Sequence, residues 1–167
     1  DVQSFGMHRL WKRRMVALAD AKPGSSALDV CCGTGDVTFA LARNGANALG
    51  VDFNAAMLRV ALERCSRLQI RSDNRSGAPM GFIRADALQL PFRDECFDAV
   101  TIAYGLRNLA SFDRGLSEML RVLRPRGRLV ILDFGKPERP VWRKAYFAYL
   151  RRMVPFYGRW FCGNADA

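Results

Sequence analysis

Histidine is nearly absent from this sequence, which has one, His8, in 167 residues. The five cysteines show no C-x-x-C spacing and are odd in number. Zinc sites and disulfide frameworks depend on such patterns, so we expect no metal and a reducing, cytoplasmic environment. No apolar run approaches the ~18 residues needed to cross a bilayer, and no signal peptide is visible.

Acidic residues are also scarce, since 16 of them face 26 lysines and arginines, for a net charge of +10. Such a chain is attracted to nucleic acid, to anionic membrane surfaces or to acidic ligands, and composition alone does not choose among them. The basic residues gather near both ends. Half of the residues are hydrophobic and a quarter are charged, which indicates one globular domain over residues 1–167.

Strand-like and helix-like segments alternate along the chain. An N-terminal helix is expected at 7–20, and strands at 26–30, 46–51, 81–84, 96–103 and 128–134. Helices are expected at 35–43, at 54–68 with a buried stripe of Met57, Leu58, Ala61, Leu62 and Cys65, and between Ser111 and Pro125. The alternation predicts an α/β fold, a mostly parallel twisted sheet with helices on both faces and a cofactor-binding core at 25–135. A helix of basic and aromatic residues is expected at 139–155.

A glycine turn joins the first predicted strand to the next helix. Gly33 and Gly35 let the backbone approach a ligand closely, and Asp52 ends the second strand, where it can bind both ribose hydroxyls. A dinucleotide site would need a third glycine, or an alanine, where Thr38 stands. Asp29 would repel a pyrophosphate yet suits the ammonium and sulfonium groups of S-adenosyl-L-methionine. A glycine turn without a ligand is the alternative.

Asp86 and Ala87 follow the third strand, where class I methyltransferases bind adenine with an acidic side chain and the next backbone N–H. Taken alone, Asp86 reads as a solvated loop carboxylate. Cys31 and Cys32 are interpreted as small residues packed under the cofactor, Cys31 standing where many methyltransferases have glycine. The expected contacts of the cofactor, or of its product S-adenosyl-L-homocysteine, are Asp29, Cys31, Gly33, Gly35, Asp52, Phe53, Met57, Asp86, Ala87 and Tyr104.

Three further motifs carry a family resemblance. The S-x-x-x-H-x-x-W pattern at residues 4–11, the segment 97–108 (FDAVTIAYGLRN) and the segment 121–127 (RVLRPRG) resemble the UbiE family of menaquinone and ubiquinone C-methyltransferases. The resemblance covers nearly the whole chain. Arg126 replaces a usual glycine, Asp133 a usual glutamate and Gly135 a usual serine. We expect a Rossmann-like class I fold that is truncated at both ends and lacks its last two strands.

The resemblance implies methyl transfer to a ring carbon of a reduced polyprenyl quinone. It places Arg107 as a catalytic residue that stabilises the phenolate or orients water, and Asn108 as the residue that positions the ring hydroxyl; both would also bind substrate. His8 and Trp11 are expected to line the substrate pocket, with general-base catalysis by His8 as the alternative. Whether the acceptor is a naphthoquinol or a benzoquinol stays open, as does the oligomeric state.

Three other functions compete with this one. The positive charge suits a methyltransferase that acts on nucleic acid, but such enzymes often carry D/N-P-P-Y/F after the fourth strand, where this chain has Tyr104 to Asn108. A methyltransferase of another small molecule and a non-catalytic cofactor-binding domain are also possible readings. The basic and aromatic C-terminal segment favours peripheral contact with the anionic inner face of a membrane over nucleic acid, although ordinary helix packing explains it equally well.

Overall fold

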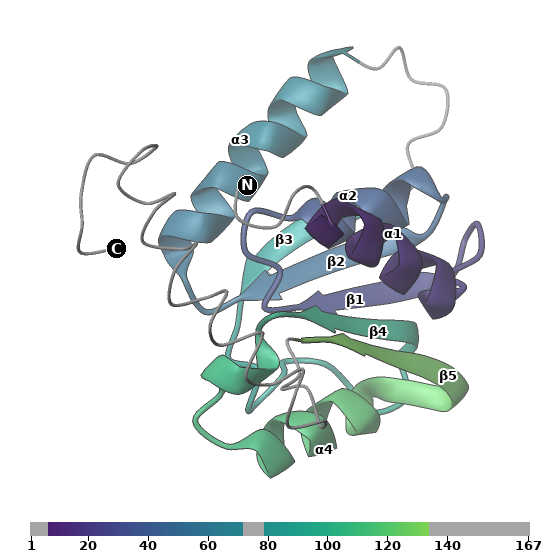
Figure 1. Ribbon diagram of the computed structural model, residues 1–167, viewed down its shortest axis with the longest axis vertical. Coiled ribbons are helices and arrows are strands. Elements are labelled where there is room, and N and C mark those ends of the chain that lie inside the picture. Colours follow the sequence, from purple (N-terminus) through teal and green to yellow (C-terminus); the bar gives the residue numbers. More distant parts are fainter. Residues whose placement is uncertain (1–6, 72–78, 134–167) are drawn as a thin grey trace, which may run out of the picture. The chain divides into compact units, whose positions relative to one another are not determined.

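Five parallel strands form one sheet in the computed structural model of the chain, in the order β3-β2-β1-β4-β5 (Figure 1). The structure describes residues 7–71 and 79–133, and Trp11–Asp133 form one compact unit. The strands are β1 (Ser26–Val30), β2 (Asn47–Asp52), β3 (Met80–Arg84), β4 (Phe97–Ala103) and β5 (Leu123–Leu132). The helices are α1 (Met7–Ala19), α2 (Asp36–Arg43), α3 (Ala55–Arg71), the 3₁₀ turn η2 (Leu106–Asn108) and α4 (Phe112–Val122). The expected parallel α/β fold is confirmed.

The chain reverses its direction across the sheet at β1. From β1 it proceeds through β2 to β3 at one edge, whereas β4 and β5 lie on the other side of β1. Because parallel crossovers are right-handed, α2 and α3 cover one face of the sheet and α4 covers the other. Such a switch point leaves a crevice at the carboxyl ends of β1 and β4, which is where open α/β sheets bind ligands.

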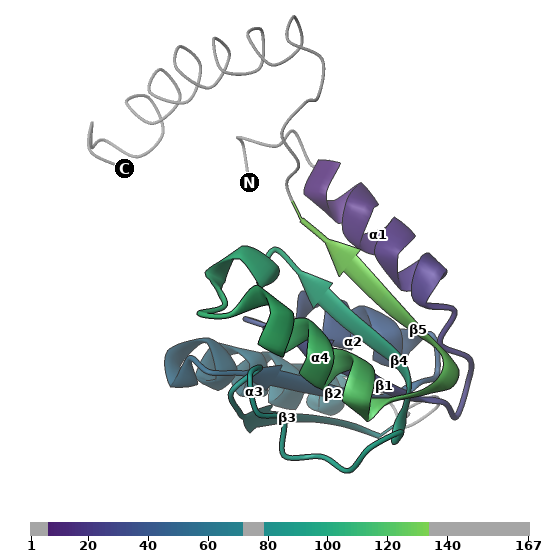
Figure 2. The same cartoon turned by 90° about the horizontal axis from the view of Figure 1, so that it is seen from below.

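Two apolar clusters fix these layers. On one face, α1 and α2 pack against Ala27, Ala48 and Ala99, and Figure 2 shows α1 beside β5. On the other face, Met119 and Val122 of α4 pack against Leu28, Val100 and other strand residues. Ala27 and Leu28 belong to opposite clusters because successive strand residues point to opposite faces.

Side chains bind the free backbone N–H groups in the first turns of two helices. The Asn54 carbonyl Oδ1 accepts the N–H groups of Ala56 (2.9 Å) and Met57 (3.3 Å) at the start of α3, and Ser111 caps α4. The predicted buried stripe of α3 is too wide. Leu58, Ala61 and Cys65 are buried, but Met57 and Leu62 are exposed, because α3 lies over the edge strand β3 and its neighbour β2.

Strand β5 starts earlier than predicted. Its ladder with β4 begins at Phe97–Leu123 and resumes at Ala99–Arg128, so the residues between Leu123 and Arg128 bulge out of the register. Arg126 has φ 67° in this bulge. Pro125 and Gly127 therefore lie in the bulge, and α4 passes into β5 without a loop.

Two expectations concern residues outside the described ones and stay predictions, namely the helix at 139–155 and the absence of the last two strands. The single domain over residues 1–167 stays a prediction. Among the helices that the structure describes, none combines the length and the apolar character that a bilayer crossing requires.

Candidate functional site

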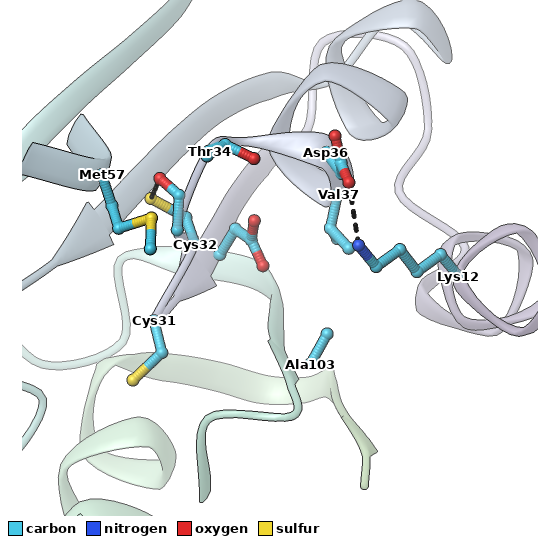
Figure 3. Close-up of a pocket in the computed structure, with 10 residues that line it drawn as sticks. Lys12, Cys31, Cys32, Thr34, Asp36, Val37, Met57 and Ala103 are labelled. Carbon is cyan, nitrogen blue, oxygen red and sulfur yellow. Dashed lines mark hydrogen bonds and ion pairs between the residues drawn. The ribbon is translucent and has the colours of Figure 1, made fainter. Parts of the chain in front are cut away.

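A pocket of about 300 Å³ opens at the switch point between β1 and β4 (Figure 3). The glycine turn forms most of its wall, α1 and the first residues of α2 close one side, and α3 contributes one side chain. Its lining residues are Lys12, Asp29, Cys31, Cys32, Gly33, Thr34, Asp36, Val37, Met57 and Ala103. Four of the predicted cofactor contacts therefore meet here: Asp29, Cys31, Gly33 and Met57.

The two glycines of the turn have different tasks. Gly33 (φ 55°) has open space where a side chain would begin, whereas a Cβ on Gly35 (φ 85°) would lie 2.7 Å from the Phe82 ring. Both backbone angles are in the left-handed region that glycine adopts without strain. Gly35 is thus required for packing and for starting α2, while Gly33 keeps the pocket wall low enough for a ligand to approach. Gly35 is not among the lining residues, so its predicted cofactor contact stays a prediction.

Asp52 fastens the glycine turn to the end of β2. Its Oδ2 accepts the Gly33 N–H (2.8 Å) and its Oδ1 accepts the Asn54 N–H (2.8 Å). A carboxylate offers about four acceptor positions, so two hydroxyl groups of a ligand can still be bound. This geometry suits the predicted ribose contact, and it adds a structural role that the sequence did not indicate.

Asp29 is buried beneath the turn, with 1% of its surface exposed. Its Oδ2 accepts hydrogen bonds from the Thr38 N–H (3.0 Å) and hydroxyl (2.7 Å), and its Oδ1 accepts one from the Thr101 hydroxyl (2.9 Å). Burial raises the pKa of Asp29 to about 6, although these hydrogen bonds favour the charged form. Thr38, whose presence excludes the dinucleotide motif, thus binds the Asp29 carboxylate with two hydrogen bonds.

Lys12 and Asp36 are pocket residues that the sequence analysis missed. Lys12 Nζ lies 2.9 Å from Asp36 Oδ2 across the pocket wall (Figure 3), and Arg64 Nη2 lies 2.8 Å from Asp36 Oδ1. Burial opposes ionisation of Asp36, but the two cations outweigh it and lower its pKa. The two ion pairs of Asp36 join α1 and α3 to the first turn of α2. In the sequence, Lys12 follows Trp11 and Asp36 follows Gly35, and these positions beside predicted site residues could have indicated them.

The predicted adenine residues lie on the loop after β3. Asp86 is exposed and accepts the Leu88 N–H on its Oδ1 (2.9 Å), while Ala87 is buried. Phe53, after β2, is 67% exposed and stacks with the Arg84 guanidinium, whose carbon lies 5.3 Å from the ring centre. These residues adjoin the ends of β2 and β3 but do not line the pocket itself, so their contacts with a cofactor stay predictions.

Two neighbouring cysteines line the pocket, and their surroundings favour the protonated thiol over the thiolate. Burial, followed by the charge of Asp52, raises the pKa of Cys31 to about 11, and burial likewise raises the pKa of Cys32. Cys31 has φ 54°, which explains why glycine suits this position. A side chain on Gly105 would collide with the Cβ of Cys31. The turn after β1 and the turn after β4 therefore fit together only because Gly105 has no side chain.

The predicted acceptor residues lie at the ends of β4 and β5. Arg107 and Asn108 are exposed on η2, and Arg107 Nη1 lies 3.5 Å from Asp133 Oδ1. Burial first, and then the charge of Asp133, raise the pKa of Tyr104, with Arg107 acting in the opposite direction. These residues flank the switch point but are not among the lining residues.

The N-terminal substrate residues are described only in part. Trp11 is 38% exposed on α1, one residue before the pocket residue Lys12. His8 belongs to the same helix, but its side chain lies outside the described residues. Substrate contact by either residue stays a prediction.

The residues of the glycine turn and its two neighbouring acids fit S-adenosyl-L-methionine. The open wall at Gly33, the doubly anchored carboxylate at Asp52 and the buried acid at Asp29 provide a close approach, hydroxyl acceptors and a negative charge for an ammonium group. With the sheet order and the switch-point pocket, they define a class I methyltransferase fold.

The particular family follows from comparison. The ubiE/COQ5 methyltransferase family matches residues 1–167, and the chain belongs to this family. The chain is 39% identical over 170 residues to the ubiquinone/menaquinone biosynthesis C-methyltransferase UbiE of Cellvibrio japonicus, covering 100% of this chain and 66% of that protein. It is 36% identical over 173 residues to the demethylmenaquinone methyltransferase of Desulfitobacterium hafniense, covering 99% and 64%.

A solved structure shows the same fold. The SAM-dependent methyltransferase from Aquifex aeolicus superposes with a TM-score of 0.64 at 22% identity, over 77% of this chain and 66% of that one. The chain spans 64% to 66% of the length of the two curated relatives.

Proposed function

We propose that this chain is the cofactor-binding part of an S-adenosyl-L-methionine-dependent enzyme that methylates a ring carbon of a reduced polyprenyl quinone. The observation that carries the proposal is the family match over the full chain together with a glycine-turn pocket at the switch point. The names of the two curated relatives support a quinone acceptor, demethylmenaquinol or the benzoquinol of the ubiquinone pathway.

In this proposal the protein holds the cofactor by its three parts. Asp52 binds the ribose hydroxyls, Asp29 faces the ammonium group, and Asp86 with the Ala87 N–H binds the adenine edge. The bound cofactor supplies an electrophilic methyl group. Because that group is already reactive, the residues of this chain contribute mainly by positioning and by excluding water.

The acceptor ring needs a group that favours loss of its phenolic proton. Arg107 offers a fixed positive charge at the end of β4, and a developing phenolate beside it is stabilised. The 3.5 Å pair with Asp133 holds the guanidinium toward β5. Asn108, next on η2, would orient the ring hydroxyl. Loss of that proton to water would increase the electron density at the ortho carbon. The bound cofactor would supply the methyl group, its carbon–sulfur bond breaking as the new carbon–carbon bond forms and S-adenosyl-L-homocysteine leaving, and the methylated ring carbon would then lose its own proton to water.

Methyl transfer from labelled cofactor to a demethylnaphthoquinol and to a demethylbenzoquinol tests the proposal. The assay uses this chain and the longest polypeptide that its gene encodes, with RNA as a third acceptor. Labelled quinol is the expected product. Labelled RNA without labelled quinol would replace the proposal by the nucleic-acid function, and cofactor binding without any transfer would indicate a binding domain.

Arg107→Ala isolates the proposed catalytic charge. We expect a methylation rate lowered by roughly 10²-fold, because one electrostatic contact in the transition state has this order of effect, with little change in cofactor affinity. Arg128→Ala is the matched control, since Arg128 is similarly exposed (53% against 51%) and pairs with Asp20 far from the pocket. Equal losses in both variants would contradict a catalytic role for Arg107.

A further inference from the structure

Three polar side chains of α4 bind the backbone of the loop that follows β3. The Arg114 Nε–H donates to the Leu88 carbonyl (3.0 Å). Glu118 Oε2 accepts the Leu90 N–H (2.8 Å), and the Arg121 Nη2–H donates to the Leu90 carbonyl (3.0 Å). Since residues three and four apart lie on the same side of a helix, these side chains form one polar stripe. The stripe faces the loop that carries Asp86 and Ala87.

Arg121 is the centre of this stripe. It forms a two-pronged pair with Glu118, with 2.7 Å from Nε to Oε1 and 2.7 Å from Nη2 to Oε2. Its Nη1 binds the Phe92 carbonyl (2.8 Å) and Asp94 Oδ1 (2.7 Å). Hydrogen bonds from Arg121 lower the pKa of Glu118, so the pair stays charged at neutral pH. A planar guanidinium held by so many partners has one arrangement, which lysine cannot reproduce.

The contacts of the stripe fix the direction of the Asp86 side chain. Asp86 Oδ1 accepts the Leu88 N–H (2.9 Å), and the Asp86 carbonyl accepts the Gln89 N–H (3.1 Å). Leu88 is thus bound to Asp86 on its N–H and to Arg114 on its carbonyl. Ala87 and Leu90 are buried in the same apolar cluster as Met119 of α4. A shift at Leu90 would therefore move the whole turn that presents Asp86.

We propose that Arg121, with Glu118, is the positioning pair that makes the nucleoside site selective for adenine. Adenine presents an amino group and a ring nitrogen acceptor, which match the Asp86 carboxylate and a backbone N–H. Hypoxanthine presents a carbonyl and a ring N–H at the same places, so both contacts become repulsive. Such discrimination requires the two groups to stay in register, which the stripe ensures. The inference rests on the adenine site assigned under the proposed function.

Two arginines of the 121–127 motif bind backbone and side-chain groups of other segments. Arg121 is its first residue, and Arg124, three residues later, binds Asp98 Oδ1 (2.7 Å) and the Glu95 carbonyl (3.2 Å). Asp98 in turn accepts the Ser26 N–H (2.8 Å). The two arginines therefore serve different places: Arg121 the nucleoside loop, and Arg124 the beginnings of β4 and β1. This makes Arg124 a matched control.

Calorimetry with S-adenosyl-L-homocysteine and S-inosyl-L-homocysteine tests the inference on the full chain. We expect the unaltered chain to prefer the adenine compound and Arg121→Ala to lower the ratio of the two affinities by about tenfold. Arg124→Ala should lower the melting temperature as much yet leave the ratio within twofold. Arg121→Lys keeps the charge but loses the two-pronged contact with Glu118, and it should give an intermediate ratio. This variant replaces Arg121→Ala if Arg121→Ala does not fold.

The outcomes separate the two proposals. Absence of binding to either compound by the unaltered chain would overturn the proposed cofactor site and this inference with it. Selective binding by the unaltered chain, with the same ratio in folded Arg121 variants, would overturn this inference alone. If Arg124→Ala lowers the affinity ratio as much as Arg121→Ala does, Arg121 only stabilises the fold, and this inference is also overturned.

Discussion

Asp29 is a buried acid whose ionisation we expect to make cofactor binding depend on pH. Its carboxyl group is held by two threonines, and burial raises its pKa to about 6, above the ordinary value of 3.8. In the proposed complex Asp29 is ionised and faces an ammonium group. Below pH 6 the unliganded protein holds a proton on Asp29, and this proton must leave before the ionic contact forms.

We therefore expect affinity for S-adenosyl-L-homocysteine to fall as the pH is lowered through 6. The dissociation constant should rise about tenfold for each pH unit below the pKa, the limit set by single-proton linkage. Calorimetry at pH 5, 6 and 7 measures it. Asp29→Asn, which does not titrate, should bind weakly with little pH dependence, and an unchanged slope in this variant would assign the effect to another group.

Asp52 accepts the Gly33 N–H and, in the proposed complex, the ribose hydroxyls. A single substitution removes both contacts, so the test needs a control. Asp52→Ala should weaken S-adenosyl-L-homocysteine binding by about 1–3 kcal/mol, because ribose hydroxyls and the Gly33 N–H lose their acceptor. Asp98 also accepts a backbone N–H, that of Ser26, at the opposite end of the sheet. If Asp98→Ala weakens calorimetric binding as much, loss of stability rather than of a ribose contact is the cause.

At the scale of the elements, the bulge that begins β5 contains a strained residue. Arg126 has φ 67°, a conformation that costs a residue with a Cβ about 1–2 kcal/mol. Next to it, a Cβ on Gly127 would come within 2.9 Å of two backbone carbonyl oxygens. Gly127 therefore fixes the path of the chain, and Arg126 must adopt the conformation that glycine prefers. The departure from the family's usual glycine is thus tolerated at a cost in stability.

Arg126→Gly should raise the free energy of unfolding by up to about 1 kcal/mol, the strain relieved less the entropic cost of glycine. Urea denaturation measures the change. Arg126→Ala keeps the Cβ and should bring no gain. Destabilisation by glycine together with no effect of alanine would show that the bulge is unstrained.

The element pattern was predictable where local chemistry decides it. The strands β1 to β4 and the caps Asn54 and Ser111 follow from alternation and from side chains that bind their own backbone. The start of β5 did not follow, because a bulge and a turn share the same proline and glycine signals. Met57 and Leu62 were misjudged because periodicity shows which side of a helix is apolar, but not how much of that side a sheet edge covers.

The residues of the candidate site also divide into those that local sequence patterns indicate and those that only the tertiary structure brings there. Gly33 and Asp29, which line the pocket, could be selected because a glycine turn and the acid of the preceding strand lie in fixed sequence positions. Asp52 is not a lining residue, and its ribose contact stays a prediction. Lys12 was missed because it reaches the pocket only through the docking of α1, which no local pattern specifies. The stripe on α4 was missed because its partners are backbone groups of a distant loop.

At the scale of the whole molecule, the charge of +10 predicts attraction to an anionic partner. We expect it to be an anionic membrane, where a polyprenyl quinol resides. Basic residues alternate with aromatic ones in the C-terminal segment, which lies outside the described residues: Arg143, Lys144, Arg151, Arg152 and Arg159 among Trp142, Tyr146, Phe156 and Trp160. Each such charge contributes on the order of 1 kcal/mol near an anionic leaflet, and aromatic rings settle at its headgroups.

Cosedimentation with liposomes measures this attachment. Binding should be stronger to anionic than to neutral vesicles and should decrease as salt is added, because screening weakens surface attraction. Replacing Arg151 and Arg152 by alanine should weaken it, whereas Arg59→Ala with Arg67→Ala on α3 provides a control of equal charge. Equal binding to both kinds of vesicle, with tight binding to RNA, would favour a nucleic-acid partner.

The fit of Cys31 against Gly105 has a consequence for how this family can change over evolutionary time. Gly105 has φ −95°, which any amino acid adopts, so the neighbouring side chains exclude a Cβ there: that of Cys31 most strongly, and Ile102 Cγ1, which would lie at 3.3 Å, less strongly. The two positions are therefore epistatic. A relative with glycine at the first position lacks the closest of these contacts and accepts alanine at the second more easily, whereas a lineage that acquires cysteine first is restricted to glycine afterwards. The order of two neutral substitutions would then decide which sequences a descendant can reach.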